Sequence, residues 1–190
     1  GDGGDELFGG YNRYFWGRDI WRSMGWIPTA ARVALARGLI SVRPQTWTKL
    51  FDGISPMLPP RLRTSLSGDK LHKLAAVLNS SSPAIMYRGL VTFWEPESVV
   101  LGADEPPTAL TDQSQQADIP DHIQRMMFLD QVSYLPDDIL AKVDRASMAV
   151  SLESRVPFLD HRVAEFAWKL PLDMNIQNGK GKWPLRRLLF

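Results

Sequence analysis

Cysteine is absent from the 190 residues of this chain. Disulfide bonds, thiolate metal ligands and a cysteine nucleophile are therefore excluded, and the redox compartment stays open. Apolar runs stay well short of the roughly 18 residues that a membrane-spanning helix needs, and no signal-peptide pattern is present. Neither sign of charge is in excess, because 22 lysine and arginine residues face 21 acidic residues and leave a net charge of +1. This balance gives no general electrostatic reason to expect a nucleic acid or an anionic membrane as a partner.

Apolar residues make up 44% of the chain, which is enough for one domain with a substantial core or for part of a larger domain. The sequence begins with Gly1 inside a motif-like loop and ends at Phe190 within a helical pattern. We therefore expect residues 1–190 to be the C-terminal part of one domain, truncated at both ends.

Helical periodicity runs through most of the chain. Apolar spacing, prolines and capping residues predict helices over residues 5–23, 29–40, 69–78 and 83–94, over the stretch that follows residue 121, over 136–150, and from residue 182 or 183 onward. Short strand pieces are expected only near 152–158. Residues 103–120 combine weak periodicity with prolines and a polar run, which predicts a surface insertion. Residues 24–120 as a whole carry no motif that indicates a role.

The first ten residues place three carboxylates in a glycine-rich loop at the start of the first predicted helix. Asp2, Asp5 and Glu6 carry hard oxygen ligands of the kind that Mg²⁺ shares with substrate phosphates. The glycines let the backbone approach a ligand where a Cβ atom would obstruct it. The same residues also fit a simpler interpretation, in which the acids complement a helix dipole and the glycines form a turn. Taken alone, the loop leaves both interpretations open.

A calcium-binding EF-hand loop is excluded by spacing. A loop that starts at Asp2 requires an oxygen ligand, a glycine and a bidentate glutamate at positions where this chain has Gly4, Leu7 and Arg13.

Two further segments combine charge with restricted backbone: residues 142–160 and residues 178–184. Together with the first loop they resemble the C-terminal synthetase domain of glutamine-dependent asparagine synthetases. The family pattern Ser-Gly-(Glu/Asp)-Gly-x-Asp-Glu-(Leu/Val)-Phe-Gly-Gly-Tyr matches residues 1–11 except for a serine that would lie upstream. Residues 135–160 are similar to its longest signature, and residues 181–186 to its closing element, with Pro184 as an unusual feature.

The resemblance implies a mostly α-helical fragment of an α/β Rossmann-like ATP-pyrophosphatase domain. It implies ATP and Mg²⁺ as cofactors, aspartate as the carboxylate that is adenylated, and ammonia from an upstream glutaminase domain as the attacking group. It also implies that a Ser-Gly-Gly-x-Asp-Ser phosphate loop lies upstream. The enzyme is expected in the cytoplasm, and a homodimer is one assembly that it could form. The fragment alone is expected to be inactive.

The resemblance also implies roles for single residues. Asp5 is the expected Mg²⁺ ligand, and Lys182 is expected against the reacting phosphate, where the chemistry needs a fixed cation. Asp2 stands where many relatives have glutamate, which is thought to pair with that lysine and to assist proton transfer. The residues expected to contact the nucleotide are Gly1, Gly3, Gly4, Asp5 and Glu6, although Glu6 fits an ordering role in the loop better than a reactive one.

Four charged residues of the second segment keep two interpretations open, namely substrate contact and an ion-pair network between helices. These residues are Asp144, Arg145, Glu153 and Arg155. Two alternatives for the function also stay open. The first is an amidotransferase of the same family that acts on another carboxylate, such as a uronic acid in polysaccharide biosynthesis. The second is a helical interaction module without catalysis.

Overall fold

The computed structural model describes residues 2–54, 68–92, 94 and 99–189, and the regular structure within these ranges is helical. The described residues contain no β-strand, and one antiparallel bridge joins Gln177 to Lys180. The prediction of a mostly helical chain is therefore confirmed. The expectation of short strands near 152–158 is wrong, because residues 152–156 form an irregular loop without a partner strand and Pro157–Leu159 form a 3₁₀ turn (η4).

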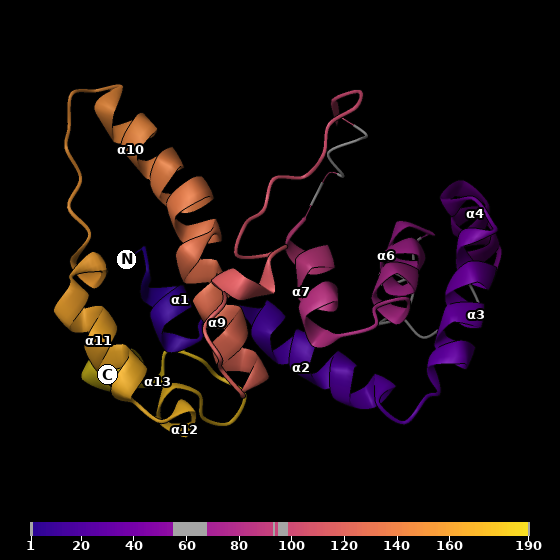
Figure 1. The fold of residues 1–190 in the computed structure, drawn as a ribbon, viewed down its shortest axis with the longest axis horizontal. Coiled ribbons are helices and arrows are strands. Elements are labelled where there is room, and N and C mark those ends of the chain that lie inside the picture. Colours follow the sequence, from indigo (N-terminus) through magenta and orange to yellow (C-terminus); the bar gives the residue numbers. More distant parts are fainter. Residues whose placement is uncertain (1, 55–67, 93, 95–98, 190) are drawn as a thin grey trace. The chain divides into compact units, whose positions relative to one another are not determined.

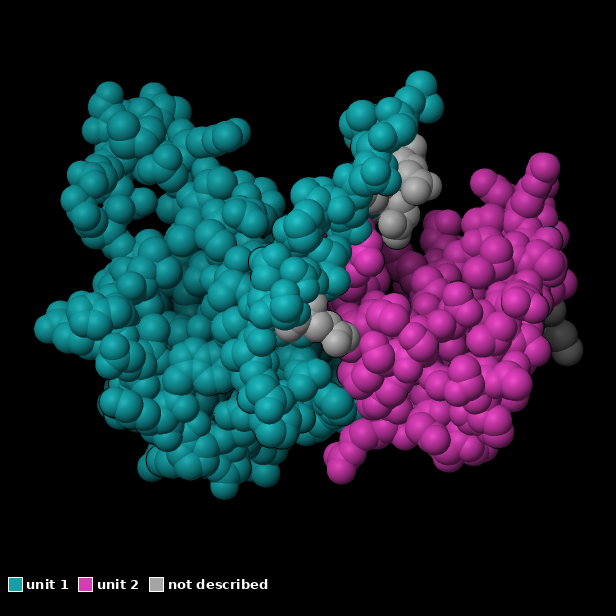
Figure 2. Space-filling model, viewed as in Figure 1, with its two compact units in different colours: residues 1–19, 94–190 teal, residues 20–93 magenta. Residues whose placement is uncertain are grey.

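The chain divides into two compact units, residues 1–19 with 94–190, and residues 20–93 (Figure 2). The boundary falls inside helix α2, Asn12–Met24. The longer helices of the first unit are α9 (His122–Val132), α10 (Ala141–Met148), α11 (His161–Lys169) and α13 (Trp183–Leu189). Its shorter elements are α1 (Gly4–Phe8), η2 (Gln113–Gln115), η3 (Leu135–Leu140) and α12 (Leu172–Asn175). The second unit holds α3 (Thr29–Ile40), α4 (Pro44–Ile54), α6 (Gly68–Leu78) and α7 (Pro83–Val91).

The single helix expected over residues 5–23 is in fact two helices, α1 and α2. Gly9 lies between them with φ of 65°, in the left-handed region that favours glycine. A Cβ atom on Gly9 would come within 2.9 Å of the Ile176 side chain, so the break also allows a close approach to the C-terminal part of the chain. The amide of Gly10 then donates to the Asp5 carbonyl at 2.8 Å and closes α1.

The core of the first unit lies where α1 meets α11 and η4 (Figure 1). Leu7, Phe8 and Ala167 are buried there, and Phe158 and Leu185 pack against them. The Phe8 and Phe158 rings meet edge to face, with their centroids 5.9 Å apart. Apolar burial thus holds the first and last helices of this unit together although they lie far apart in the sequence.

Helix α9 forms the second support of α1. Asp121 caps its start, because the Asp121 carboxylate accepts hydrogen bonds from the amides of Ile123 and Gln124 at 2.8 and 3.0 Å. The apolar stripe predicted after residue 121 is buried, and its members are Ile123, Met126, Met127 and Leu129. The next helical stretch begins at Leu135 as the π-helical segment η3 and continues through α10 to Met148. Asp138 and Lys142 form an i, i+4 ion pair at 2.6 Å on its surface.

In the second unit, α6 packs against α3, α4 and α7. Ala36 and Ala75 are fully buried, as the core-packing interpretation of residues 29–40 requires. Arg32 is buried too, and its guanidinium lies 5.7 Å from the Trp21 ring centre and donates to the Ser80 carbonyl. Within the described residues, no helix is both long and apolar enough to cross a membrane.

Residues 103–120 contain the 3₁₀ turn η2 as their one regular element. Asp112 organises this turn by accepting hydrogen bonds from the amide and the hydroxyl of Ser114, which hold the pKa of Asp112 below its usual range. That the segment is an insertion stays a prediction.

Candidate functional site

The acidic loop packs closely against η4, and glycine stands at two of its positions of closest contact. Gly3 precedes α1 with φ of 82°, and a Cβ atom there would lie 3.3 Å from the Cβ of Phe158. A Cβ atom on Gly4 would lie 3.3 Å from the Phe158 ring. The glycines of this loop therefore serve packing and backbone conformation as well as any approach to a ligand.

Asp5 and Lys182 form an ion pair although most of the chain separates them in sequence. The Lys182 Nζ lies 2.7 Å from the Asp5 Oδ2, and about 30% of each side chain remains exposed (31% for Asp5, 28% for Lys182). The roles that the resemblance implies for Asp5 and Lys182 require them at one site, and the structure places these two side chains together. Lys182 directly precedes α13, and a cation at the N-terminus of a helix interacts unfavourably with the helix dipole. The Asp5 carboxylate compensates for this unfavourable interaction.

The backbone around Lys182 is fixed against the end of α1. The Lys182 amide donates to the Phe8 carbonyl at 2.8 Å, and Arg186 Nε donates to the Gly181 carbonyl at 3.0 Å. A Cβ atom on Gly181 would overlap the Gly9 carbonyl oxygen, so only glycine allows the two backbones to touch. Lys182 has φ of 58°, an uncommon conformation for a side-chain-bearing residue that these contacts enforce.

Glu6 follows Asp5 in sequence but lies in a different environment. Its side chain is buried (1% exposed), and its Oε1 accepts a hydrogen bond from the Tyr11 hydroxyl at 2.7 Å. Partial burial and this hydrogen bond raise the pKa of Tyr11 well above its usual range, so the phenol stays a donor. Glu6 therefore orders the loop and does not join Asp5 at the surface.

The described residues contain no preformed cluster of three acidic or histidine side chains that would hold a metal ion. Asp2 is half-buried and forms no ion pair with a described residue, and Gly1 lies outside the described residues. A pairing of Asp2 with Lys182 stays a prediction. Asp5 thus offers a single carboxylate, which fits Mg²⁺ because this ion commonly takes one or two protein carboxylates and completes its shell with water and substrate phosphates.

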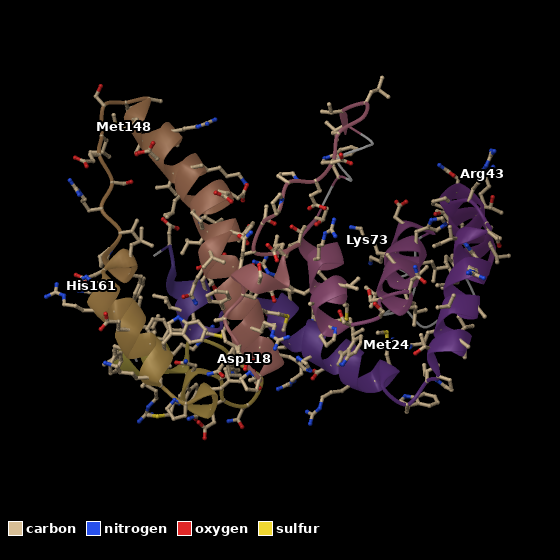
Figure 3. The ribbon with its side chains drawn as sticks, viewed as in Figure 1. Met24, Arg43, Lys73, Asp118, Met148 and His161 are labelled. Atoms are coloured by element: carbon tan, nitrogen blue, oxygen red, sulfur yellow. The ribbon has the colours of Figure 1, made fainter. Side chains whose placement is uncertain are left out.

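A cavity of about 720 Å³ lies between α10, the loop that follows it and the start of α11. Figure 3 labels the two ends of this loop, Met148 and His161. Asp144, Arg155 and Asp160 contribute charged groups to the cavity wall, which is otherwise mainly apolar. Leu159 also lines the cavity and would lie 3.5 Å from a Cβ atom on Gly3, so the cavity adjoins the acidic loop.

Of the four charged residues expected in this region, Asp144 and Arg155 line the cavity, whereas Arg145 and Glu153 are outside its wall. Glu153 and Arg155 pair at 2.7 Å within one exposed loop. Among the described residues, this local pair is the one ion pair that the four residues form, so they build no network between helices. Their contact with a substrate stays a prediction.

Sequence patterns did not indicate a group of polar residues behind the acidic loop. Gln131 donates to the Glu6 carbonyl at 3.0 Å and accepts a hydrogen bond from the Trp168 indole at 2.9 Å. Asp130 is buried and pairs with Arg13 at 2.6 Å. The only sequence signal for these contacts is a pair of polar residues directly after the apolar stripe of α9.

A family model for asparagine synthase matches residues 1–189. Asparagine synthetase [glutamine-hydrolyzing] 1 of Bacillus subtilis is 30% identical over 190 residues, which cover 98% of this chain and 27% of that protein. Asparagine synthetase [glutamine-hydrolyzing] 3 of the same organism is 38% identical over 69 residues, which cover 36% of this chain and 11% of that protein. A search of solved structures found no significant match.

The acidic loop, the lysine that closes it and these relatives place the chain among synthetase domains. More narrowly, it belongs to the asparagine synthase family. The chain spans about a quarter of the length of the curated relative that it matches over nearly its whole length, 27% in that comparison.

Proposed function

We propose that the chain forms one part of the synthetase site of an asparagine synthetase. In this reaction a side-chain carboxylate oxygen of aspartate attacks the α-phosphorus of ATP, pyrophosphate leaves, and ammonia derived from glutamine then displaces AMP to give asparagine. Membership of the family supports ATP-dependent amidation. The observation that carries the site is the Asp5–Lys182 ion pair at the glycine-rich loop.

The helices are proposed to belong to a Rossmann-like α/β domain of a cytoplasmic enzyme, with the phosphate loop and the glutaminase in other parts of the protein. Mg²⁺ supplies neutralisation of the phosphate charge when it is bound with ATP. Asp5 would hold the ion, because its carboxylate is partly exposed and fixed in direction by Lys182. Lys182 would place its ammonium against the reacting phosphate, where preorganised charge is most effective.

Asp2 is the proposed proton acceptor of the second step. Its carboxylate lies next to Gly3 at the mouth of the loop and forms no ion pair with a described residue, so it is available to take a proton from the attacking nitrogen. Aspartate has one methylene fewer than glutamate, so the carboxylate depends on the conformation of Gly3 to reach the nitrogen.

The cavity beside the acidic loop is the proposed site of the acceptor. Arg155 offers a guanidinium that binds a carboxylate in a bidentate manner, and Asp144 offers a carboxylate for an ammonium group. An α-amino acid carries both groups, whereas a uronic acid carries only the carboxylate. The opposite charges of Arg155 and Asp144 in one cavity wall therefore favour aspartate over a uronic acid.

ATP–pyrophosphate exchange in the complete protein tests the function. We expect Asp5→Asn to abolish exchange without unfolding the protein, because a neutral amide is a poor Mg²⁺ ligand. Lys182→Ala is expected to reduce the exchange rate about 100-fold. Asp173→Asn and Lys169→Ala, at exposed positions away from the loop, are the matched controls and should behave like wild type. Exchange at the wild-type rate in Asp5→Asn would remove Asp5 from the site.

The same assay identifies the acceptor. Aspartate should support exchange and a uronic acid should not, and Asp144→Asn should raise the KM for aspartate while Asp137→Asn, an exposed acid outside the cavity wall, leaves it unchanged. Exchange that depends on a uronic acid would establish the other amidotransferase. A complete protein that folds but shows no exchange with any carboxylate would favour the interaction module.

A further inference from the structure

The acidic loop depends on a helix that is too short to hold itself. Helix α1 has five residues, so it forms barely more than one turn, and helices of this length have no independent stability in water. The orientation of Asp5 is therefore decided by the contacts of α1 with the rest of the first unit. Lys182 holds one carboxylate oxygen of the Asp5 side chain, and the contacts of α1 hold its backbone.

A second set of contacts holds α1 through Glu6, the residue next to Asp5. The Tyr11 hydroxyl donates to the Glu6 side chain at 2.7 Å, and the Gln131 amide donates to the Glu6 backbone carbonyl at 3.0 Å. Both bonds are shielded from solvent on the Glu6 side, which is 1% exposed. The Tyr11 bond ends on a buried carboxylate, and such bonds are stronger than neutral ones and costly to lose.

Each of the two donors is itself fixed by a neighbour. The Trp168 indole of α11 donates to Gln131 at 2.9 Å, which leaves the Gln131 amide nitrogen directed at Glu6. The Tyr11 ring lies 4.1 Å from the guanidinium of Arg13, which in turn pairs with Asp130 of α9 at 2.6 Å. The chain of contacts thus runs from α9 and α11 to Glu6, the residue that directly follows Asp5.

From this geometry we infer that Tyr11, Gln131 and Trp168 are positioning residues for Asp5, acting through Glu6. This inference rests on the proposed function, because it assumes that Asp5 binds Mg²⁺ together with the substrate phosphate. Removing a group that hydrogen-bonds to a metal-binding residue and orients it commonly lowers metal affinity or activity by about 10-fold to 100-fold. Glu6 itself is an anchor and does not touch the nucleotide.

The test uses the complete protein with two variants, Tyr11→Phe and Trp168→Phe. Each variant removes one hydrogen-bond donor and keeps an aromatic ring at that position. Tyr134→Phe is the matched control, because Tyr134 packs on the same Arg13 guanidinium at 4.6 Å but forms no hydrogen bond to Glu6. Two quantities are measured: deuterium exchange of the amides of residues 4–9 without ligands, and the Mg²⁺ concentration that half-saturates ATP–pyrophosphate exchange. Glu6→Gln keeps an acceptor for Tyr11 and serves as the conservative variant.

We expect Tyr11→Phe and Trp168→Phe to speed deuterium exchange in residues 4–9 and to raise the half-saturating Mg²⁺ concentration about 10-fold or more. The KM for aspartate should stay unchanged, Tyr134→Phe should match wild type, and Glu6→Gln should lie closer to wild type than Glu6→Ala. A merely structural role would lower the amount of folded enzyme and leave the Mg²⁺ dependence of the remainder unchanged.

Unaltered deuterium exchange in both variants overturns the inference, and so does faster exchange without a change in Mg²⁺ dependence. Failure of the proposed function has a different signature, namely a folded wild-type protein without ATP–pyrophosphate exchange or an Asp5→Asn variant as active as wild type. In that case deuterium exchange in residues 4–9 still decides whether Tyr11 and Trp168 anchor α1.

Discussion

Gly10 leaves open the space that the Asp5–Lys182 pair occupies. A Cβ atom on Gly10 would overlap the Asp5 Oδ1 and approach the Cε of Lys182 within 2.4 Å. Both atoms belong to the side chains of the ion pair, so a Cβ atom on Gly10 fits only if that pair moves. Glycine at this position is therefore a requirement of the site and not only of the turn between α1 and α2.

We predict that Gly10→Ala destabilises the protein by about 1–3 kcal/mol, the usual cost of overpacking, and lowers ATP–pyrophosphate exchange by separating Asp5 from Lys182. Gly38→Ala in α3 is the matched control, because a Cβ atom there would meet nothing within 4 Å. That variant should gain roughly 0.5–1 kcal/mol, since alanine is the better helix former. Chemical denaturation measures both values, and a Gly10→Ala variant as stable as wild type would contradict the packing.

The family resemblance singled out Asp5 and Lys182 in advance but not the residues that support them. Asp5 and Lys182 lie in short segments that combine charged residues with glycine, and this pattern can be recognised in the sequence alone. Gln131 and Trp168 lie within amphipathic helices, where a single polar or aromatic residue is unremarkable until the fold directs it at a partner. Glu6 shows the same limit, because sequence groups it with Asp5 whereas burial separates the two.

At the level of elements, local signals gave the bounds of some helices, although α7 ends at Val91 and not at residue 94 as predicted. Residues 29–40 were predicted from Pro28 and the apolar spacing, and α3 has these bounds. Ser82 caps α7 and Asp121 caps α9, each through its own side chain. The break at Gly9 was missed because its reason is distant: the close approach of Ile176 and Gly181, which no local pattern encodes.

Helix α11 gives a prediction with a defined pH dependence. Asp160 caps this helix by accepting a hydrogen bond from the Arg162 amide at 2.9 Å, and the Arg162 guanidinium also binds it at 2.7 Å. The Arg162 side chain, followed by its amide, holds the pKa of Asp160 well below its usual range. A carboxyl with a lowered folded-state pKa adds stability above its unfolded pKa of about 3.9 and loses it as the pH falls further.

We therefore expect Asp160→Asn to be less stable than wild type near pH 7, because asparagine keeps the cap but not the charge. The difference should shrink as the pH falls below about 4, because Asp160 then binds a proton in the unfolded chain while the folded protein still holds its pKa lower. Urea midpoints of the two proteins between pH 2 and 7 measure it. A difference that stays constant over this range would show that the charge of Asp160 does not contribute.

At the level of the whole molecule, several apolar side chains of the first unit lie in solvent, including residues at the ends of α10 and α13. Val150 after α10 is 74% exposed, and Leu188 and Leu189 at the end of α13 are 82% and 76% exposed. Exposed apolar groups of this kind mark surfaces that other protein segments cover. The described part of the chain contains no strand, so these residues contribute none to the proposed Rossmann-like sheet.

The last prediction concerns the 190-residue chain on its own. We expect it to bind Mg-ATP weakly and to make no asparagine, because the phosphate loop and the glutaminase are proposed to lie in other parts of the protein and Asp5 is already paired with Lys182. We also expect it to self-associate through the exposed residues near Val150 and Leu188. Calorimetry with Mg-ATP and sedimentation at several concentrations measure the two properties, with the complete protein and the variant Leu188→Lys as controls. Micromolar binding of ATP by the chain alone would show that these residues suffice for the nucleotide site, and a monomer at all concentrations would show that its apolar surface needs no partner.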